Sequence, residues 1–372
     1  MQHPIAADLL AQRWTPAQAQ AWHQRLPWLM GANFCPSTAG NQLEMWSVET
    51  FDPATIDREL GWAAAAGMNA MRVFLHDLFW IDDASGFLER IETYLQIADQ
   101  HGISTLFVFF DSVWHPFPHL GTQREPERGV HNSMWVQSPG VPTLRNPQAF
   151  RQLETYVRGV IRHFREDPRI HGWDLWNEPD NANTSSYGPR DLGAEKSEKV
   201  EPLLAEVFRW ARAEKPTQPL TSGVWMGDWS DDLGLTPLQR LQLYASDIIS
   251  FHNYQNLSGM QKVVASLARF QRPLWCTEYM ARGANSLFTE VTPWLQAQKI
   301  GAYNWGLVQG RTQTHLPWPS WQTPATDENG LWFHEVFHSD GRPYDAGEIA
   351  VLKAARAAAP SSQPVTHALT RL

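Results

Sequence analysis

Short apolar segments alternate with amphipathic segments along most of the 372-residue chain. The apolar segments show little polar alternation, which is typical of parallel strands that are buried on both faces. This pattern predicts eight strands, at residues 28–34, 70–75, 104–110, 170–176, 219–225, 248–254, 273–279 and 300–308.

The segments between these strands have the apolar spacing of helices. In the clearest one, Asp52 caps a helix that begins at Pro53 and ends at Gly67. Comparable segments lie at 86–101, 147–166, 196–215, 258–271, 286–299 and 345–358, and a weaker one lies at 236–246. Eight strands that are each followed by a helix predict an α/β fold, the (β/α)8 TIM barrel. A doubly wound open sheet is the alternative, but no glycine-rich phosphate-binding motif follows the first strand.

Three connections are long, and each follows the carboxyl end of a predicted strand. They are residues 111–146 after the third strand, 177–195 after the fourth and 309–344 after the eighth. Barrel active sites are built from loops at these ends, and loops of this length are usually functional. No linker or internal repeat divides the chain. We therefore expect a single catalytic domain over residues 1–372, with a barrel core at about 28–358 and peripheral segments at 1–27 and 359–372.

Composition narrows the choice of partners and compartment. The net charge is −9 and no basic stripe is present, so nucleic acid is not an expected partner. No apolar run has the length of a membrane span, and the first residues do not resemble a signal peptide. Cytoplasmic localisation is the prediction, although an exported chain that had been trimmed would look the same. Cys35 and Cys276 suggest neither a disulfide nor a metal site, and the sequence does not predict an oligomeric state.

Two glutamates occupy equivalent positions at the ends of predicted strands. The fourth strand runs into Asn177, Glu178 and Pro179, and the seventh ends at Glu278. Strands four and seven of an eight-stranded barrel face each other across its mouth, so the two carboxyls should face each other as well. A single glutamate at a strand end is most simply a salt-bridge partner. Two carboxyls across a pocket are the minimum needed to cleave a glycosidic bond.

Further motifs give the chain a resemblance to clan A of the retaining glycoside hydrolases, most closely to the cellulase family, family 5. It is carried by Asn177-Glu178-Pro179, by His252-Asn253-Tyr254 on the sixth strand, by Glu278, by Arg72 on the second strand and by Trp305 on the eighth. The resemblance implies a retaining β-glycosidase that acts on a β-linked glycan or oligosaccharide without a cofactor or metal. In it, Glu178 is the acid/base and Glu278 the nucleophile.

The other matched residues have chemistry that suits supporting roles. Arg72 would keep the nucleophile charged and oriented. Tyr254 would donate a hydrogen bond to the nucleophile, and His252 would bond either to Tyr254 or to the substrate. The amide of Asn177 suits the sugar 2-hydroxyl, and Trp305 would form a flat floor beneath the sugar at the cleaved bond.

The chain departs from the family pattern after the third strand. The cellulase family usually has a histidine two residues after an aspartate there, whereas this chain has Val113 two residues after Asp111. Either His115 or His76 is expected to take the place of that histidine. Asp111, His115 and His76 are therefore second-rank site candidates.

Nineteen tryptophans suit both a large core and the stacking of sugar rings. Trp225 after the fifth strand and Trp318 in the last long loop are candidates to line a sugar site, with ordinary packing as the alternative for Trp225. A catalytically silent sugar-binding barrel is the main alternative function. A metal-dependent barrel hydrolase is a third possibility, although such a site needs clustered histidines and the strand ends supply them singly.

Overall fold

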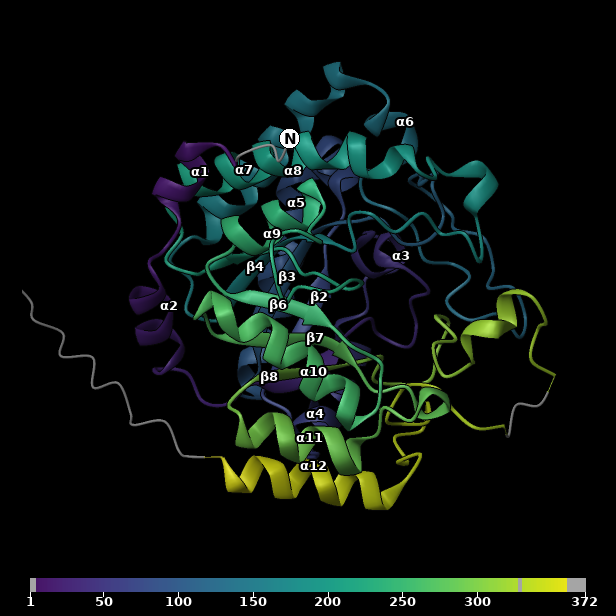
Figure 1. The fold of residues 1–372 in the computed structure, drawn as a ribbon. Helices are drawn as coiled ribbons and strands as arrows, with labels where there is room; N and C mark the ends of the chain where they lie inside the picture. Colours follow the sequence, from purple (N-terminus) through teal and green to yellow (C-terminus); the bar gives the residue numbers. More distant parts are fainter. Residues whose placement is uncertain (1–4, 327–329, 360–372) are drawn as a thin grey trace, which may run out of the picture.

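The computed structural model describes residues 5–326 and 330–359, and its strands form one parallel eight-stranded sheet. The strand order is β5-β4-β3-β2-β1-β8-β7-β6. The strands are β1 (Met30–Asn33), β2 (Ala70–Phe74), β3 (Ser104–Asp111), β4 (Ile170–Asn177), β5 (Leu220–Thr221), β6 (Ile249–His252), β7 (Leu274–Tyr279) and β8 (Gly301–Trp305). Val224, just beyond β5, pairs in parallel with Phe251 of β6, which closes the barrel. The predicted (β/α)8 barrel is thereby confirmed (Figure 1).

Helices alternate with the strands and cover the outside of the barrel (Figure 1). They are α4 (Pro53–Ala65), α5 (Asp77–Gln100), α7 (Phe150–Phe164), α8 (Glu195–Ala213), α9 (Pro237–Ala245), α10 (Leu257–Leu267), α11 (Phe288–Ala297) and α12 (Ala346–Ala358). Asp52 caps α4 by accepting a hydrogen bond from the Thr55 amide, as predicted. The weakly predicted segment at 236–246 forms α9, because Thr236 and Gln239 cap its first turn reciprocally.

Several predicted boundaries differ from the structure, and two of these differences have a clear cause. The helix expected at 86–101 is the second part of α5, which begins at Asp77. His76 caps that earlier start, and the non-helical backbone of Asp83 interrupts the helix, so its apolar pattern is continuous only beyond the break. The fifth strand, expected at 219–225, pairs regularly with β4 at only two positions, Leu220 and Thr221.

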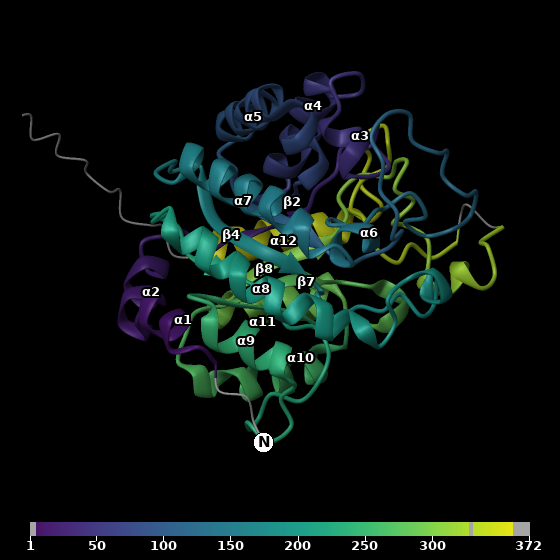
Figure 2. The same ribbon diagram turned by 90° about the horizontal axis from the view of Figure 1, so that it is seen from above.

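The N-terminal segment lies at the end of the barrel opposite the long loops (Figures 1 and 2). Helices α1 (Ala7–Gln12) and α2 (Pro16–His23) lie on the side away from the long loops in both views (Figures 1 and 2). The ring of Trp22 lies between Trp14 and Trp275 of β7, with ring centroids 5.9 and 6.1 Å apart. The expected peripheral segment thus covers the amino-terminal ends of the strands. Residues 1–4 and 360–372, which include most of the expected C-terminal tail, lie outside the described residues.

The long loops after β3 and β8 lie side by side at the carboxyl ends of the strands (Figures 1 and 2). The side chain of Gln313 donates to the carbonyl oxygen of Glu127 at 2.8 Å, and the Ala325 amide donates to Gly129 at the same distance. Two short helices that the sequence did not predict, α3 (Gln42–Trp46) and α6 (Val141–Leu144), belong to the same end of the barrel.

Neither cysteine forms a disulfide. Among the described helices, none is both long and apolar enough to cross a membrane.

Candidate active site

The two predicted glutamates meet in the barrel mouth. Glu178 follows β4, Glu278 lies in β7, and their exposed fractions are 8% and 5%. A carboxyl oxygen of Glu178 lies within 4.8 Å of a carboxyl oxygen of Glu278. Asn177 and Glu178 line the same pocket although successive strand residues point to opposite faces. This is possible because Glu178 has left the strand, with φ at +42° in the left-handed region.

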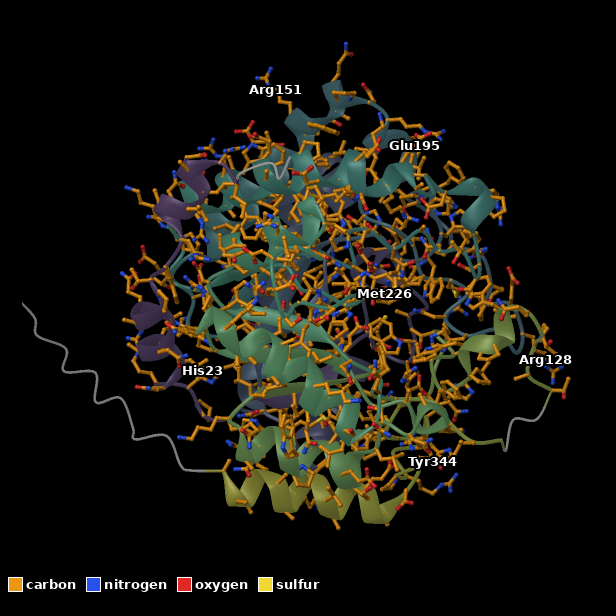
Figure 3. The ribbon with its side chains drawn as sticks, in the orientation of Figure 1. His23, Arg128, Arg151, Glu195, Met226 and Tyr344 are labelled. Atoms are coloured by element: carbon orange, nitrogen blue, oxygen red, sulfur yellow. The ribbon has the colours of Figure 1, made fainter. Side chains whose placement is uncertain are left out.

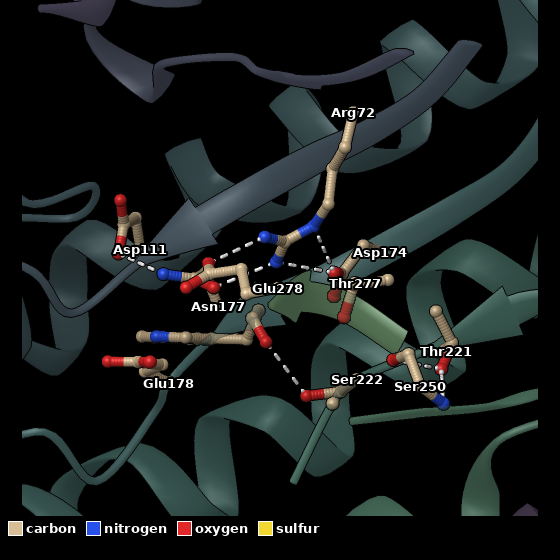
Figure 4. A network of polar contacts seen from close by, with 12 residues as sticks. Arg72, Asp111, Asp174, Asn177, Glu178, Thr221, Ser222, Ser250, Thr277 and Glu278 are labelled. Carbon is tan, nitrogen blue, oxygen red and sulfur yellow. Dashed lines mark hydrogen bonds and ion pairs between the residues drawn. The ribbon is translucent and has the colours of Figure 1, made fainter. Parts of the chain in front are cut away.

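Arg72 organises the base of the site, and Figure 4 shows its guanidinium between Asp174 on one side and Asn177 and Glu278 on the other. Its Nη1 donates to Glu278 Oε1 at 2.9 Å and to Asn33 Oδ1 at 2.8 Å. Its Nη2 donates to Asp174 Oδ2 and to Asn177 Oδ1, both at 2.8 Å. Two buried carboxylates thus share one buried cation, which fixes the orientation of the Glu278 side chain.

The second oxygen of Glu278 also has close partners. The Tyr254 hydroxyl donates to Oε2 at 2.8 Å, and Nδ1 of His252 lies 3.4 Å from the same atom. Burial raises the pKa of Glu278 above its ordinary value and the neighbouring Glu178 adds to this effect, while the charge of Arg72 and the Tyr254 hydrogen bond act in the opposite direction. These partners favour the ionised form, which a nucleophile must have.

Glu178 is held in a different state. Burial raises its pKa to about 7, and the nearby charge of Asp180 adds to that effect. The Asn181 amide donates to Oε2 at 2.7 Å, and Nδ1 of His252 lies 2.9 Å from Oε1. Burial also lowers the pKa of His252 to about 4, so this imidazole is neutral at neutral pH. Glu178 is therefore the carboxyl that can hold a proton near pH 7, as a general acid requires.

Asp111 lies behind Asn177 and does not line the pocket. Its Oδ1 accepts a hydrogen bond from the Asn177 amide at 2.9 Å, and its Oδ2 accepts one from the Trp135 indole at 2.6 Å. Burial raises the pKa of Asp111 to about 7. Its contacts make it a residue that positions Asn177, with Arg72 holding the other end of the same amide.

The two histidines considered as substitutes lie outside the pocket lining. His76 caps α5, accepting from the Leu78 amide and contacting the Gln137 carbonyl oxygen. His115 packs edge-on against Tyr187, with ring centroids 4.9 Å apart. The histidine that the loop after β3 does bring to the pocket is His131, whose Nδ1 donates to the Leu316 carbonyl oxygen.

Several residues of this site were missed by the sequence analysis, among them Asn33, Asp174 and His131. Asn33 and Asp174 are polar residues within the apolar strand segments 28–34 and 170–176, and that interruption was an available signal. His131 lies in an irregular loop far from any strand end, where spacing gives no such signal.

The pocket around the glutamates has an empty volume of about 1390 Å³. Its lining includes the predicted Trp225, Trp305 and Trp318, with Trp114 in addition. The Trp225 indole donates to Asp180 at 2.6 Å, and the Trp318 ring lies edge-on to Tyr254 at 5.0 Å. Apolar walls around a few converging polar groups are typical of a ligand site, and flat rings suit the apolar faces of sugars.

One group of described side chains has the geometry to hold a metal ion, namely Glu178, His252 and Glu278. It coincides with the acid and nucleophile pair. The Arg72 guanidinium already contacts Glu278 at 2.9 Å, and its positive charge disfavours a second cation at the same carboxylate.

The chain is similar to known proteins in part of its sequence and in its fold. Residues 140–317 match the family model described as "Glycosyl hydrolase catalytic core". No curated protein matches the chain.

Several solved structures share the fold. Beta-1,4-mannanase from the sea hare Aplysia kurodai is 16% identical with a TM-score of 0.53, covering 74% of this chain and 87% of that one. A variant of GH5_18 from Streptomyces cattleya, in complex with Manβ1-4GlcNAc, is 13% identical with a TM-score of 0.55, covering 90% and 83%. Exo-beta-1,4-mannosidase Op5Man5 from Opitutaceae bacterium strain TAV5 is 17% identical with a TM-score of 0.57, covering 88% and 59%.

Proposed function

We propose that this chain, which matches a glycosyl hydrolase catalytic core over residues 140–317, is a retaining β-glycosidase acting on β-mannosides through Glu178 and Glu278. The observation that carries the proposal is the pair of buried carboxyls whose oxygens lie within 4.8 Å. Retaining enzymes hold their carboxyls about 5 Å apart, whereas inverting enzymes leave roughly 6.5–9.5 Å for a water molecule between carboxyl and sugar. The alternative of a catalytically silent sugar-binding barrel gains no support from a site that keeps both carboxyls.

The geometry supports a two-step reaction. In the first step, Glu278 attacks the anomeric carbon while Glu178 gives its proton to the departing glycosidic oxygen. The bond from carbon to the leaving oxygen breaks as the bond to the Glu278 carboxylate forms. In the second step, Glu178 takes a proton from a water molecule, which attacks the same carbon and releases Glu278. The sugar leaves with the configuration it had in the substrate.

The residues around the two glutamates fit this two-step reaction. Arg72 and Tyr254 each donate to one oxygen of Glu278, which keeps the carboxylate ionised and aimed before attack. Asn177, held between Arg72 and Asp111, is placed to contact the sugar beside the reacting carbon. Trp305 lines the same pocket and would lie beneath the sugar ring.

The proposal of a β-mannoside substrate is supported by the names of the structural neighbours. Two of them are called a beta-1,4-mannanase and an exo-beta-1,4-mannosidase, and a third is in complex with Manβ1-4GlcNAc. For this chain we accordingly propose a carbohydrate partner whose cleaved linkage belongs to a β-configured mannose.

A panel of aryl glycosides tests the substrate. The β-mannoside, β-glucoside, β-galactoside and β-xyloside of one phenol, with the α-mannoside as stereochemical control, are incubated with the enzyme in the presence of EDTA. We expect the fastest phenol release from the β-mannoside and no effect of EDTA, because Arg72 rather than a metal neutralises Glu278. Release from a different sugar would contradict the mannoside assignment. Activity that EDTA abolishes and a divalent metal restores would instead support a metal site at Glu178, His252 and Glu278.

A further inference from the structure

We propose that Asn181 positions the catalytic acid: its amide holds the Glu178 carboxyl so that the proton of the acid lies on Oε1, the oxygen beside His252. This inference rests on the retaining mechanism proposed above and adds a residue that acts on the reaction through Glu178. It is carried by hydrogen bonds that lead from a buried ion pair, Lys196–Asp191, to the Glu178 carboxyl.

The orientation of the Asn181 side-chain amide is fixed by its partners. The backbone N–H of Asn183 lies 2.9 Å from Oδ1 of Asn181. A backbone N–H can only donate, so the atom that faces it must be the amide oxygen. The amide nitrogen then faces Glu178 and donates to Oε2 at 2.7 Å. Reversing the amide would set two donors against each other at Asn183, so Asn181 can only donate to Glu178 in this geometry.

This hydrogen bond decides which oxygen of neutral Glu178 carries the proton. A neutral carboxyl has one hydroxyl oxygen, which donates, and one carbonyl oxygen, which is the stronger acceptor. An N–H at Oε2 therefore favours the form in which Oε2 is the carbonyl oxygen and Oε1 bears the proton. Nδ1 of His252 lies 2.9 Å from Oε1. Burial lowers the pKa of His252 to about 4, so the imidazole is neutral and can accept a hydrogen bond from the acid.

A proton on Oε1 is on the side where the reaction takes place. Nδ1 of His252 lies 2.9 Å from Glu178 Oε1 and 3.4 Å from Glu278 Oε2, so one imidazole nitrogen is adjacent to both carboxyls. In a retaining mechanism the anomeric carbon and its leaving oxygen lie between the two carboxyls. Asn181, by occupying Oε2, leaves Oε1 to turn its proton from His252 to the leaving oxygen when a substrate is bound.

Asn183, which fixes the Asn181 amide, is itself held by a buried ion pair. Lys196 Nζ lies 2.5 Å from Asp191 Oδ2, and both side chains are fully buried. The Asn183 amide donates to the same Asp191 oxygen at 2.6 Å and to the Ser112 carbonyl oxygen at 2.8 Å. These contacts hold Asn183 at a φ of +50°, a left-handed conformation that asparagine tolerates better than most residues.

Lys196 occupies a costly position. It lies in the first turn of α8, directly after the exposed Glu195 that Figure 3 labels. A positive charge in the first turn opposes the helix dipole, and its burial costs free energy unless the charge is paired. Its partners are Asp191 and the Ser112 carbonyl oxygen, which lies 3.1 Å from Nζ. The lysine therefore belongs to the structure of the loop after β4 rather than to the surface of α8.

Ser112 also holds the backbone on either side of Glu178. Its amide donates to the Asn177 carbonyl oxygen at 3.2 Å, and its hydroxyl donates to the Pro179 carbonyl oxygen at 3.1 Å. The backbone of the acid and the Asn181 amide are therefore held by one buried cluster. This leaves the Glu178 carboxyl little freedom to rotate away from its hydrogen-bond partners.

Removal of the Asn181 amide changes the pKa of Glu178 in a defined direction. Burial raises that pKa, the Asn181 hydrogen bond lowers it, the charge of Asp180 raises it and that of Arg72 lowers it. Further titratable groups near this carboxyl include His252, Glu278, Tyr254 and Asp111. All of these groups remain when Asn181 is replaced, and an N–H donor stabilises the ionised carboxyl. Loss of the donor therefore raises the pKa, and the fall of kcat/KM with pH moves to higher pH.

Two substitutions test the inference through the pH dependence of kcat/KM on phenyl β-mannoside. Asn181→Ala removes the donor. Asn181→Asp also removes it but keeps an oxygen that accepts from Asn183, so it is the matched control for the structure of the loop. We expect the fall at alkaline pH to move upward by about one pH unit in Asn181→Ala. In Asn181→Asp it should move at least as far, because the new carboxylate is a like charge beside Glu178.

The value of kcat/KM below the fall gives a second readout, the ability to protonate the leaving group. In Asn181→Ala this value should be about tenfold lower than in wild type on phenyl β-mannoside, because the acid is less well placed. It should change less on dinitrophenyl β-mannoside, whose leaving group departs without a proton. In the Glu178→Gln background, Asn181→Ala should not shift the pH dependence further, because the group through which Asn181 acts is gone.

An unshifted alkaline fall in both variants would overturn the inference. An equal loss on both mannosides would also overturn it, because Asn181 would then only shape the pocket. Thermal unfolding shows whether each variant is folded, and Asn181→Asp decides if Asn181→Ala is not. If wild type cleaves another aryl β-glycoside rather than the mannoside, the mannoside assignment fails and the same comparison is made on that sugar. If wild type cleaves none, the proposed function fails and this inference fails with it.

Discussion

Replacing Glu278 by alanine is expected to lower the rate of glycoside hydrolysis by a factor on the order of 10⁵ to 10⁶, the loss typical of removing a covalent nucleophile. The structure provides the reason. The two oxygens of Glu278 are aimed by Arg72 and Tyr254, and the facing carboxyl of Glu178 is committed to the leaving oxygen. The measurement is the initial rate on an aryl β-mannoside, compared with wild type under the same conditions.

The fold should survive this substitution. Arg72 keeps its ion pair with Asp174 at 2.8 Å, so no buried charge is left unpaired. Circular dichroism and thermal unfolding of the Glu278→Ala protein are the controls. A wild-type rate in a folded variant would refute the assignment of Glu278.

Chemical rescue distinguishes Glu278 from Glu178 as the nucleophile. In Glu278→Ala, azide can enter the vacated space and attack the anomeric carbon of an activated β-mannoside, displacing the phenol in one step. The product should be the α-mannosyl azide, because the attack comes from the face that Glu278 occupied. A β-mannosyl azide would mean that azide attacked from the opposite face of the sugar. The carboxylate removed with Glu278 would then not be the nucleophile, which would contradict the assigned roles.

Replacing Glu178 by glutamine has the second largest expected effect. Loss of a general acid slows hydrolysis by about 10²- to 10⁴-fold when the leaving group needs protonation. Alkyl and phenyl mannosides should show the full loss. Dinitrophenyl mannoside should show a smaller loss in the first step, because its leaving group departs without a proton. An equal loss for all leaving groups would contradict the role of Glu178 as the acid.

The pH dependence gives an independent test of the same residue. Burial raises the pKa of Glu178 to about 7, and the protonated form is the active acid, so kcat/KM should fall as the pH rises through about 7. Burial also raises the pKa of Asp111 to about 7, and that carboxyl remains in the variant. If the fall of kcat/KM at alkaline pH disappears in Glu178→Gln, the group that titrates is Glu178. If the fall is unchanged, another group causes it.

The raised pKa of Glu178 should also make the stability of the folded protein depend on pH. A carboxyl whose pKa is raised by folding stabilises the protein at low pH, and this contribution is lost as the pH rises through the folded-state pKa. The unfolding temperature of Glu178→Gln minus that of wild type should therefore be larger above about pH 7 than below about pH 5. The glutamine side chain has nearly the same shape, so packing is matched between the two proteins.

The sequence predicted the barrel because its strands are buried on both faces and read as continuous apolar segments. Boundaries failed where a tertiary contact decided them. His76 starts α5 early through a cap that also depends on the Gln137 carbonyl oxygen, sixty-one positions away in sequence. The regular pairing of β5 stops at Thr221 although the apolar segment continues to Trp225.

The site was predictable where strand geometry fixes a side chain. Residues at strand ends, such as Asn177, His252 and Trp305, all line the pocket as the sequence analysis expected. Residues in long loops were not predictable in this way, because the path of a loop depends on what it packs against. His131 reaches the pocket through its contact with Leu316, while His115 turns away toward Tyr187.

The central claim is that Glu278 attacks the anomeric carbon directly. Proton NMR of the first sugar released from an aryl β-mannoside, recorded before mutarotation, tests it most directly. Two successive displacements predict β-mannose as the initial product. Initial release of α-mannose would mean a single displacement by water, and would contradict a mechanism built on two carboxyls within 4.8 Å.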